Sequence, residues 1–484
     1  MAASTSISGS PSKSAQVRAR LKHPVIVSDG HSVEFQPALR DYIRQVAGPD
    51  LAARYRSDGA SWYRMSWDQR RAERPLRPPW WPLPTKNTLD RATATFPKLL
   101  HERLDQTGID FAVLYPTAGL GAPHIRDDEL RQATCRAFNT FHADAFREYS
   151  DRLTPAAVIP MHTPQEAIAE LEYAVRTLGL KVIMMAGHVR RPIPAATQSL
   201  SHPTRYAYWL DLFALDSAYD YDPVWAKCIE LGVAPSFHSS GMGWGSRTSI
   251  SNYMFNHIGH FASAGEALCK AMFFGGVTRR FPDLRCAFLE CGVGWACSLY
   301  ADMIGHWQKR NGKAMENYNP ANLDRKLFQD LARRYGGKLV TDKLDGRGEG
   351  WGIGGTDEDP NALDDWSRCG IERAEDIRDR FVPNFYFGCE ADDPINAMAF
   401  DRRKLPFGAN LNAIFSSDIG HWDVPDMTEV TEEAYEMVEH GLIDEDSFRD
   451  FVFANPARLW TSMNPDFFKG TVVEGAVKGL IGGR

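Results

Sequence analysis

Side chains that could bind a metal ion gather where a short apolar run ends near the start of the chain. Residues 25–27 lead directly into Asp29, His31 and Glu34 in the stretch PVIVSDGHSVEF. An apolar run that ends in such residues is typical of a buried strand with reactive groups at its carboxyl end. Neutral imidazole and carboxylate groups together bind Zn, Fe or Mn. This strand end is therefore a candidate metal site.

Three later apolar runs end in the same kinds of residue, namely His238, Glu290 and Asp418. A single His or Asp after a strand is usually a turn or capping residue, but four strand ends that supply His and carboxylate together predict a metal site. A divalent ion held there would lower the pKa of its bound water toward about 7 and polarise a carbonyl group. Further histidines close to these positions in the sequence are His257, His260 and His421.

The same short apolar runs recur along the chain and are separated by segments of helical period. Runs without polar alternation favour parallel strands that are covered on both faces. Alternation of strand and helix over about 400 residues predicts an α/β fold of the (β/α)8 TIM-barrel type, whose active site lies at the carboxyl ends of the strands. A doubly wound open sheet is the alternative, but no GxGxxG follows the first run. The eight candidate strands are residues 24–29, 110–115, 154–160, 181–187, 233–238, 285–290, 384–388 and 413–418.

We expect one barrel domain over residues 24–465 with two insertions. Residues 50–100 are rich in aromatic residues, Arg and Pro, and residues 306–382 are charged. We expect both insertions to lie over the open, carboxyl-terminal face of the barrel or at a subunit contact. Residues 1–23 are Ser-rich without an apolar core, which predicts a disordered tail, and residues 466–484 form a C-terminal tail.

The amino-acid composition limits the classes of binding partner that we expect. The net charge of the 484-residue chain is -7, so nucleic acid and anionic membranes are not expected as partners. The eight cysteines are scattered without a CxxC pair, which favours reduced thiols and a cytoplasmic location. We expect a small-molecule substrate and a homodimer or higher homo-oligomer.

Several stretches resemble the amidohydrolase superfamily, in particular the branch that includes aminocarboxymuconate-semialdehyde decarboxylase. The resemblance covers roughly residues 25–461 and implies a metal-dependent TIM barrel. FGGVTRRFPDLR before a strand, together with a late strand that ends in Ser-Asp, is fairly specific. The stretches are DGHSVE, AVIPMHTPQEAIAELEYAV, PSFHSS, FGGVTRRFPDLRCAFLECGVGW, IFSSDIGHWD and NPARLW.

The resemblance assigns a role to the first strand, with one departure. The family pattern is Asp-x-His-x-His, with both histidines on the metal. Asp29 and His31 match its first two positions, but the second His is replaced by Val33, which cannot ligate. Glu34 is the obvious substitute. A regular strand would point positions 33 and 34 to opposite faces, so the chain must leave strand geometry there.

The later strands match the family at two positions and depart from it at a third. His238 corresponds to a metal-binding His, and Asp418 to an Asp that binds metal and handles a proton. Glu290 stands where the family has a catalytic His, so it is either a general acid/base or a ligand of a second ion. We prefer the ligand role, shared with His260 rather than His257 because of the spacing of His260 from GGVTRRFP. The predicted ligands of one or two Zn, Fe or Mn ions are His31, Glu34, His238, His260, Glu290 and Asp418, and Asp29, His257 and His421 are predicted to orient them or to replace one of them.

The resemblance leaves several functions open. We favour a hydrolase in which metal-activated water attacks the carbonyl of an amide, ester or thioester, with Asp418 or Glu290 moving the proton. The alternatives are an oxygen-activating enzyme with two ions (Fe with Fe or Mn), a non-oxidative decarboxylase and a non-catalytic scaffold. The residues predicted to line the substrate pocket are His162, His188, Trp244, Trp295 and Trp422.

Overall fold

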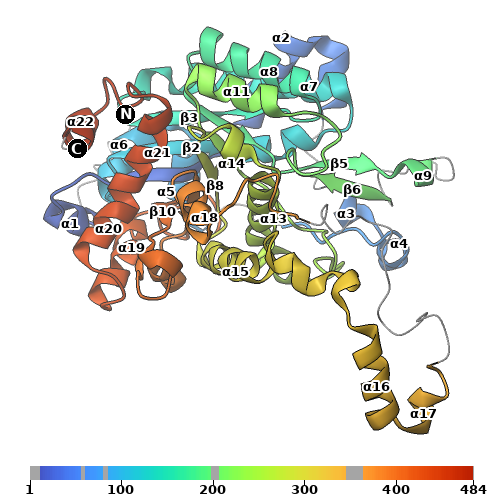
Figure 1. Ribbon diagram of the computed structural model, residues 1–484. Coiled ribbons are helices and arrows are strands. Elements are labelled where there is room, and N and C mark those ends of the chain that lie inside the picture. The colour runs from blue at the N-terminus through green and yellow to red at the C-terminus, as the bar shows by residue number, and fades with distance from the viewer. Residues whose placement is uncertain (1–10, 56–59, 80–85, 198–206, 345–363, 483–484) are drawn as a thin grey trace, which may run out of the picture.

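The computed structural model describes residues 11–55, 60–79, 86–197, 207–344 and 364–482, and these form a barrel surrounded by helices (Figure 1). Eight parallel strands follow one another around the barrel in chain order. All eight candidate strands are present, so the predicted (β/α)8 fold is confirmed. The strands are β1 (Ile26–Ser32), β2 (Phe111–Pro116), β3 (Leu153–Ile159), β4 (Val182–Met185), β7 (Pro235–Phe237), β8 (Cys286–Phe288), β9 (Phe385–Cys389) and β10 (Asn412–Phe415).

Two backbone hydrogen bonds connect the first strand to the end of the last. The amide of Asp418 donates to the carbonyl of Asp29 (3.0 Å), and the amide of His31 donates to the carbonyl of Ile419 (2.7 Å). Both bonds lie at the carboxyl end of the barrel. They therefore hold two strand ends, which are separated by almost 390 residues in the sequence, beside each other.

Helices cover the outer face of the barrel, so every residue of the first four barrel strands is buried. One of these helices begins at Pro164, where Thr163 and Glu166 form a reciprocal capping box. The surrounding helices are α2 (Gln36–Arg54), α5 (Thr88–Thr95), α6 (Pro97–Thr107), α7 (Asp128–Phe146), α8 (Pro164–Glu172), α11 (Asp222–Leu231), α13 (His260–Phe274), α14 (Val277–Arg280), α15 (Gly294–Arg310), α18 (Ala374–Phe381), α19 (Val430–Glu439), α20 (Glu445–Arg449) and α21 (Asn455–Met463).

Part of the predicted N-terminal tail forms a helix. Helix α1 (Lys13–Arg20) is capped by Ser12, whose Oγ accepts from the amide of Ala15 (3.0 Å). Ser14 and Val17 are buried against the barrel, and Ser14 Oγ accepts from the amide of Thr431 at the start of α19 (3.0 Å). The prediction of disorder is therefore wrong for residues 11–23, because capping and burial stabilise a short helix there. Residues 1–10 lie outside the described part of the chain.

The C-terminal tail also packs on the barrel. Phe467 and Phe468 are buried, and the ring of Phe467 stacks on Trp460 of α21. Helix α22 (Glu474–Gly482) follows and buries Val477. Phe468 contacts Phe111 at the start of β2, so this tail covers the amino-terminal end of that strand.

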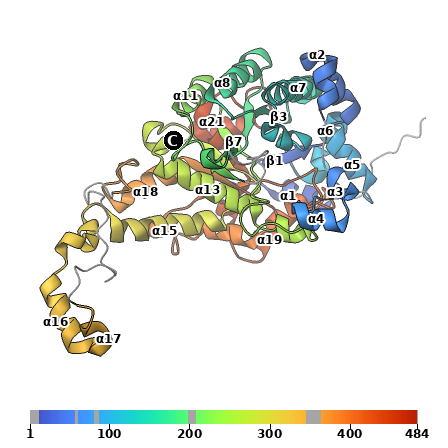
Figure 2. The same ribbon diagram turned by 90° about the vertical axis from the view of Figure 1, so that its right-hand side faces the viewer.

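The two insertions differ in where they lie relative to the barrel. In the first, α3 (Ala60–Arg64) and α4 (Trp67–Glu73) precede Arg77, whose guanidinium donates to the carbonyl of Ser251 in the loop after β7 (2.7 Å). In the second, α16 (Arg325–Tyr335) and α17 (Gly337–Thr341) project away from the barrel (Figures 1 and 2). A hairpin of β5 (Val189–Pro192) and β6 (Tyr208–Asp211) adds a further element after β4.

Two expectations from composition can be compared with the structure. All eight cysteines are buried and free, as expected for reduced thiols. Among the helices of the described segments, none combines the length and the apolar character that crossing a membrane requires.

Candidate metal centre

Five buried side chains from four strand ends meet at the carboxyl end of the barrel. The Nε2 atoms of His31 and His238 lie 3.2 Å apart. His31 Nε2 lies 3.2 Å from Asp418 Oδ1 and 3.6 Å from Asp29 Oδ1. His238 Nε2 lies 3.3 Å from Glu290 Oε2. The structure thus brings together four of the predicted ligands and the predicted orienting residue Asp29.

Local backbone conformation aims the carboxylates of Glu290 and Asp418 into this site. Both residues have positive φ, 53° and 54°, a region that side chains other than Gly rarely adopt. Such strain is commonly found at functional sites, where the surrounding fold enforces it. Gly30 lies between Asp29 and His31, and a Cβ atom at this position would stand only 2.8 Å from Ile419 Cγ1. The close approach of the last strand end to the first therefore requires Gly at position 30.

The protonation states of these groups suit a cation. Burial lowers the pKa of His31 far below its usual value and that of His238 to about 3, so both imidazoles are neutral. Burial and the charge of Asp418 raise the pKa values of Asp29 and Glu290 well above the usual range. Neither carboxylate oxygen of Asp29 accepts a hydrogen bond from any described residue. A divalent ion would offset this crowded negative charge and use the neutral imidazoles as ligands, so the residues fit such an ion.

A second group of possible ligands shares Glu290. Its carboxylate lies close to His257 and Asp423, with one ligand atom of each residue within 4.8 Å of the others. His257 Nδ1 lies 3.2 Å from both the hydroxyl of Tyr253 and Nε2 of His260. Glu290 also belongs to a group with His31, Asp418 and His421. A carboxylate placed between two groups in this way could bridge two ions.

Two predicted ligands lie outside these groups. His260 contacts His257 through Nε2 and Ser240 Oγ through Nδ1 (3.1 Å), so it supports His257 instead of joining Glu290. The chain leaves strand geometry after Ser32, as expected, but Glu34 then turns toward the loop after β2. Its Oε2 accepts from the amide of Ala118 (3.0 Å). The geometry therefore favours His257 as a ligand over both His260 and Glu34.

We expect His257→Ala to lower the amount of bound metal more than Glu34→Ala does. His257 belongs to a ligand group, whereas Glu34 belongs to none of the groups among the described residues and accepts from a backbone amide through one carboxylate oxygen. Metal content per chain, measured by mass spectrometry on protein purified without added metal, checks this order. If Glu34→Ala lowered the metal content more than His257→Ala, Glu34 would again be the ligand in place of the family's second His.

A pocket of about 340 Å³ opens above the strand ends. His421 and Trp422 lie in its wall, and Pro79 comes from the first insertion. The other predicted pocket residues lie elsewhere: Trp244 packs against the buried His188, and Trp295 packs on Phe288 outside the barrel. The lining residues are Pro79, Thr117, Leu120, Gly121, His124, His238, Ser240, Met242, Tyr253, His257, His260, Phe261, Glu290, His421, Trp422 and Asp423.

This arrangement agrees with the comparison of the sequence with known families. The amidohydrolase family model matches residues 61–318, which is more than half of the chain and includes His238 and Glu290. The chain belongs to the amidohydrolase family. The resemblance seen in the sequence motifs is thereby confirmed.

Solved structures with the same architecture cover nearly the whole amidohydrolase chain. An amidohydrolase from Mycobacterium avium subsp. paratuberculosis K-10 is 17% identical with a TM-score of 0.51, and the match covers 91% of this chain and 100% of that one. A dihydroxybenzoic acid decarboxylase from Polaromonas sp. JS666, with bound manganese and an inhibitor, is 16% identical with a TM-score of 0.47 over 91% and 97%. The 5-carboxyvanillate decarboxylase from Sphingomonas paucimobilis is 15% identical with a TM-score of 0.46 over 90% and 98%. At 17% identity, the similarity to the Mycobacterium avium amidohydrolase supports the barrel fold and not a particular reaction.

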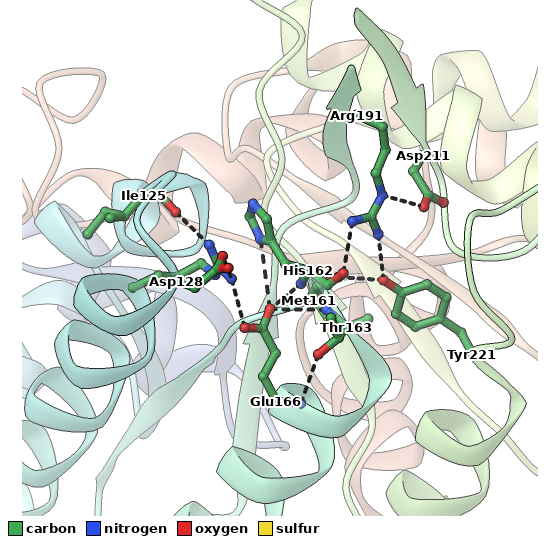
Figure 3. A network of polar contacts seen from close by, with 10 residues as sticks. Ile125, Asp128, Met161, His162, Thr163, Glu166, Arg191, Asp211 and Tyr221 are labelled. Carbon is green, nitrogen blue, oxygen red and sulfur yellow. Dashed lines mark hydrogen bonds and ion pairs between the residues drawn. The ribbon is translucent and has the colours of Figure 1, made fainter. Parts of the chain in front are cut away.

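His162 belongs to a buried polar network beside the pocket of this amidohydrolase (Figure 3). The backbone amide of His162 donates to Glu166, and its carbonyl accepts from Arg191 (2.9 Å). Glu166 in turn accepts from Arg131, which is almost fully buried (2.8 Å). Tyr221 donates to the carbonyl of Met161 (2.6 Å). The network therefore holds the chain after β3 in place and connects it to the β5–β6 hairpin.

We expect Glu166→Gln to destabilise the fold by about 2 kcal/mol, because Arg131 loses its buried ionic partner and keeps the exposed carboxylate of Asp128. Asp68→Asn is the matched control, since its pair with Arg71 is exposed and contributes about 0–1 kcal/mol. The midpoint of urea unfolding, measured for both variants, checks this expectation. Equal midpoints would show that the network contributes nothing beyond a surface pair.

Two acidic residues near the centre were not predicted. Asp423 joins the second ligand group, and burial together with the charge of Asp418 raises its pKa to about 7. Glu390 directly follows β9, and burial together with the same charge raises its pKa to about 8. The sequence did carry a signal for Glu390, because it is one more carboxylate at the end of a barrel strand. Asp423 lies in a loop, five residues after Asp418. In a loop, sequence spacing alone does not predict where a side chain points.

Proposed function

We propose that this amidohydrolase is a metal-dependent hydrolase that cleaves an amide, ester or thioester bond in a small, uncharged and largely apolar molecule. The observation that carries the proposal is the polarity of the pocket. Leu120, Met242, Phe261 and other apolar side chains form its walls, and no Lys or Arg occurs among the described residues that line it.

The charge at the floor of the pocket favours an uncharged substrate. Glu290 and Asp423 line the pocket, and Asp29 and Asp418 lie directly beneath. An anionic substrate would find no cationic side chain among the described lining residues, so the metal ion alone would have to offset its repulsion by these carboxylates in a partly desolvated site. A neutral carbonyl compound avoids this repulsion.

The residues that would hold a divalent ion are His31, His238, Asp418 and Glu290. When bound, such an ion would polarise the substrate carbonyl and lower the pKa of a water molecule toward about 7. Asp418 and His421 then provide for proton transfer, since His421 Nδ1 lies 2.9 Å from Asp418 Oδ1. Burial lowers the pKa of His421, but the charge and the hydrogen bond of Asp418 outweigh this effect and raise the pKa above its usual value. His421 can therefore carry a proton to a leaving group at the pocket wall.

Non-oxidative decarboxylation is the second candidate function. Tyr253, Phe261 and Trp422 line a pocket whose volume, about 340 Å³, suits a molecule with one aromatic ring. An aromatic acid could place its carboxylate at the metal ion, which would offset part of the repulsion from Glu290 and Asp423.

One assay panel tests both candidates. The purified protein is stripped of metal, reloaded with Mn, Zn or Fe(II), and incubated with neutral aryl esters, thioesters, anilides and lactones, and separately with hydroxylated aromatic acids. We expect metal-dependent hydrolysis of at least one neutral substrate and no release of carbon dioxide from the acids. Release of carbon dioxide without hydrolysis would replace the first proposal by the second.

A further inference from the structure

The second insertion contains a helical segment that exposes an apolar face. We call residues 324–344, which include α16 and α17, the arm. No residue of α16 or α17 is buried, and the arm projects from the body of the protein (Figures 1 and 2). Leu327, Leu331 and Tyr335 are 54%, 45% and 69% exposed. Their spacing of four residues places them along one side of α16, as in a helix that packs against a partner.

The arm is cationic, whereas the rest of the chain is strongly anionic. It carries six Lys and Arg residues against three Asp residues, a net charge of +3, so the remaining residues of the chain carry -10. Opposite charge on two surfaces steers their encounter and favours contact between them. A second copy of this chain, whose residues outside the arm carry -10, is a partner of opposite net charge for the arm.

An apolar groove lies close to the base of the arm. It has a volume of about 780 Å³ and runs between α13 and α15. Phe274, Trp295, Leu299 and Met303 line its floor, and Tyr318, six residues before the arm, lies in its wall. The rim carries acidic residues that could meet the basic side of an arm, namely Glu266, Asp302 and Asp365, together with the basic residues Arg247, Lys270 and Arg310.

We propose that the arm of one chain docks into this groove of a second copy, and that the second copy docks its own arm in return. In a two-fold dimer the same surface patch must serve both partners, and here arm and groove are neighbours within one patch. Because each chain docks its arm into the other, the interface contains the arm–groove contact twice. This doubles the buried surface area and helps it to reach the roughly 1,000 Å² that a specific interface needs. Burial of Leu327, Leu331 and Tyr335 supplies the apolar centre of this interface.

The first test measures the mass of the full-length protein in solution by light scattering after gel filtration. We expect a dimer of twice 54.3 kDa. The double variant Leu327→Glu/Leu331→Glu should be a monomer with an unchanged circular dichroism spectrum. Leu442→Glu is the matched control, because Leu442 is also about half exposed but lies far from the arm in the sequence, and it should remain a dimer. A monomeric wild-type protein, or a dimeric double variant, would overturn the proposal.

The second test locates the docking site. A protein carrying Leu331→Cys is mixed with one carrying Ser298→Cys, which lies in the groove, and a short bismaleimide is added. All eight native cysteines are buried, so the introduced thiols react selectively. We expect a cross-linked dimer in the mixture and none in either protein alone. No cross-link in the mixture, or a monomer that binds anionic phospholipid vesicles through the arm, would overturn the groove as the docking site.

Discussion

The variant His31→Ala is expected to lose the metal ion at the centre of the barrel and its activity while it keeps its fold. His31 belongs to both ligand groups at the centre of the barrel, one with Asp29 and His238 and the other with Glu290, Asp418 and His421. Loss of its imidazole therefore weakens both of these groups, whereas the group of His257, Glu290 and Asp423 does not contain His31. A bound metal ion contributes several kcal/mol to transition-state stabilisation, so activity should fall by roughly 1,000-fold or more.

The measurement combines metal content, activity and circular dichroism on one preparation. Asp418→Ala should behave in the same way, because Asp418 Oδ1 lies 3.2 Å from His31 Nε2. His306→Ala is the matched control, since His306 is an exposed residue of α15 that bonds the carbonyl of Asp302 in its own helix and belongs to none of the ligand groups found among the described residues. A His31→Ala protein with full metal content would show that the ion is held elsewhere.

Glu290→Gln is expected to remove one of two metal ions. Glu290 is shared by the group around His31 and the group of His257 and Asp423, and its Oε2 lies 3.3 Å from His238 Nε2. The substitution keeps the shape of the side chain and removes the negative charge that binds a cation. The ion near His257 has fewer other ligands, so it should be lost first, while the ion near His31 remains.

The same variant separates the two roles of Glu290. A general acid/base would leave the metal content unchanged, and its loss would reduce turnover by roughly 100- to 10,000-fold. Full metal occupancy with lost activity would therefore contradict the ligand role, and unchanged activity would remove Glu290 from the site. Metal analysis of the wild-type protein also bears on the reaction, because two ions that include iron would favour either oxygen activation or a hydrolase with two metal ions.

The strands and most of the centre were predictable because they depend on local patterns. Apolar runs of four to seven residues identify buried strands wherever they fold, and parallel strands bring their carboxyl ends to one side. Hence His31, His238, Glu290 and Asp418 could be placed together before any pairing was known. The predictions that failed or stayed open depend on contacts between distant segments. Helix α1 is one example, since it is stable only because Ser14 and Val17 are buried against the barrel.

The choice between His257 and His260 shows why spacing alone was insufficient. His257 ends helix α12 (Tyr253–His257) and His260 begins α13, and Gly259 between them has a φ of 73°. This turn, and not the distance along the sequence, sets which ring faces Glu290. Glu34 is similar, because its direction depends on the amide of Ala118 in the loop after β2. Residue types and strand ends thus define the chemistry, whereas the packing of loops from separate parts of the barrel selects the side chains that contact the ion.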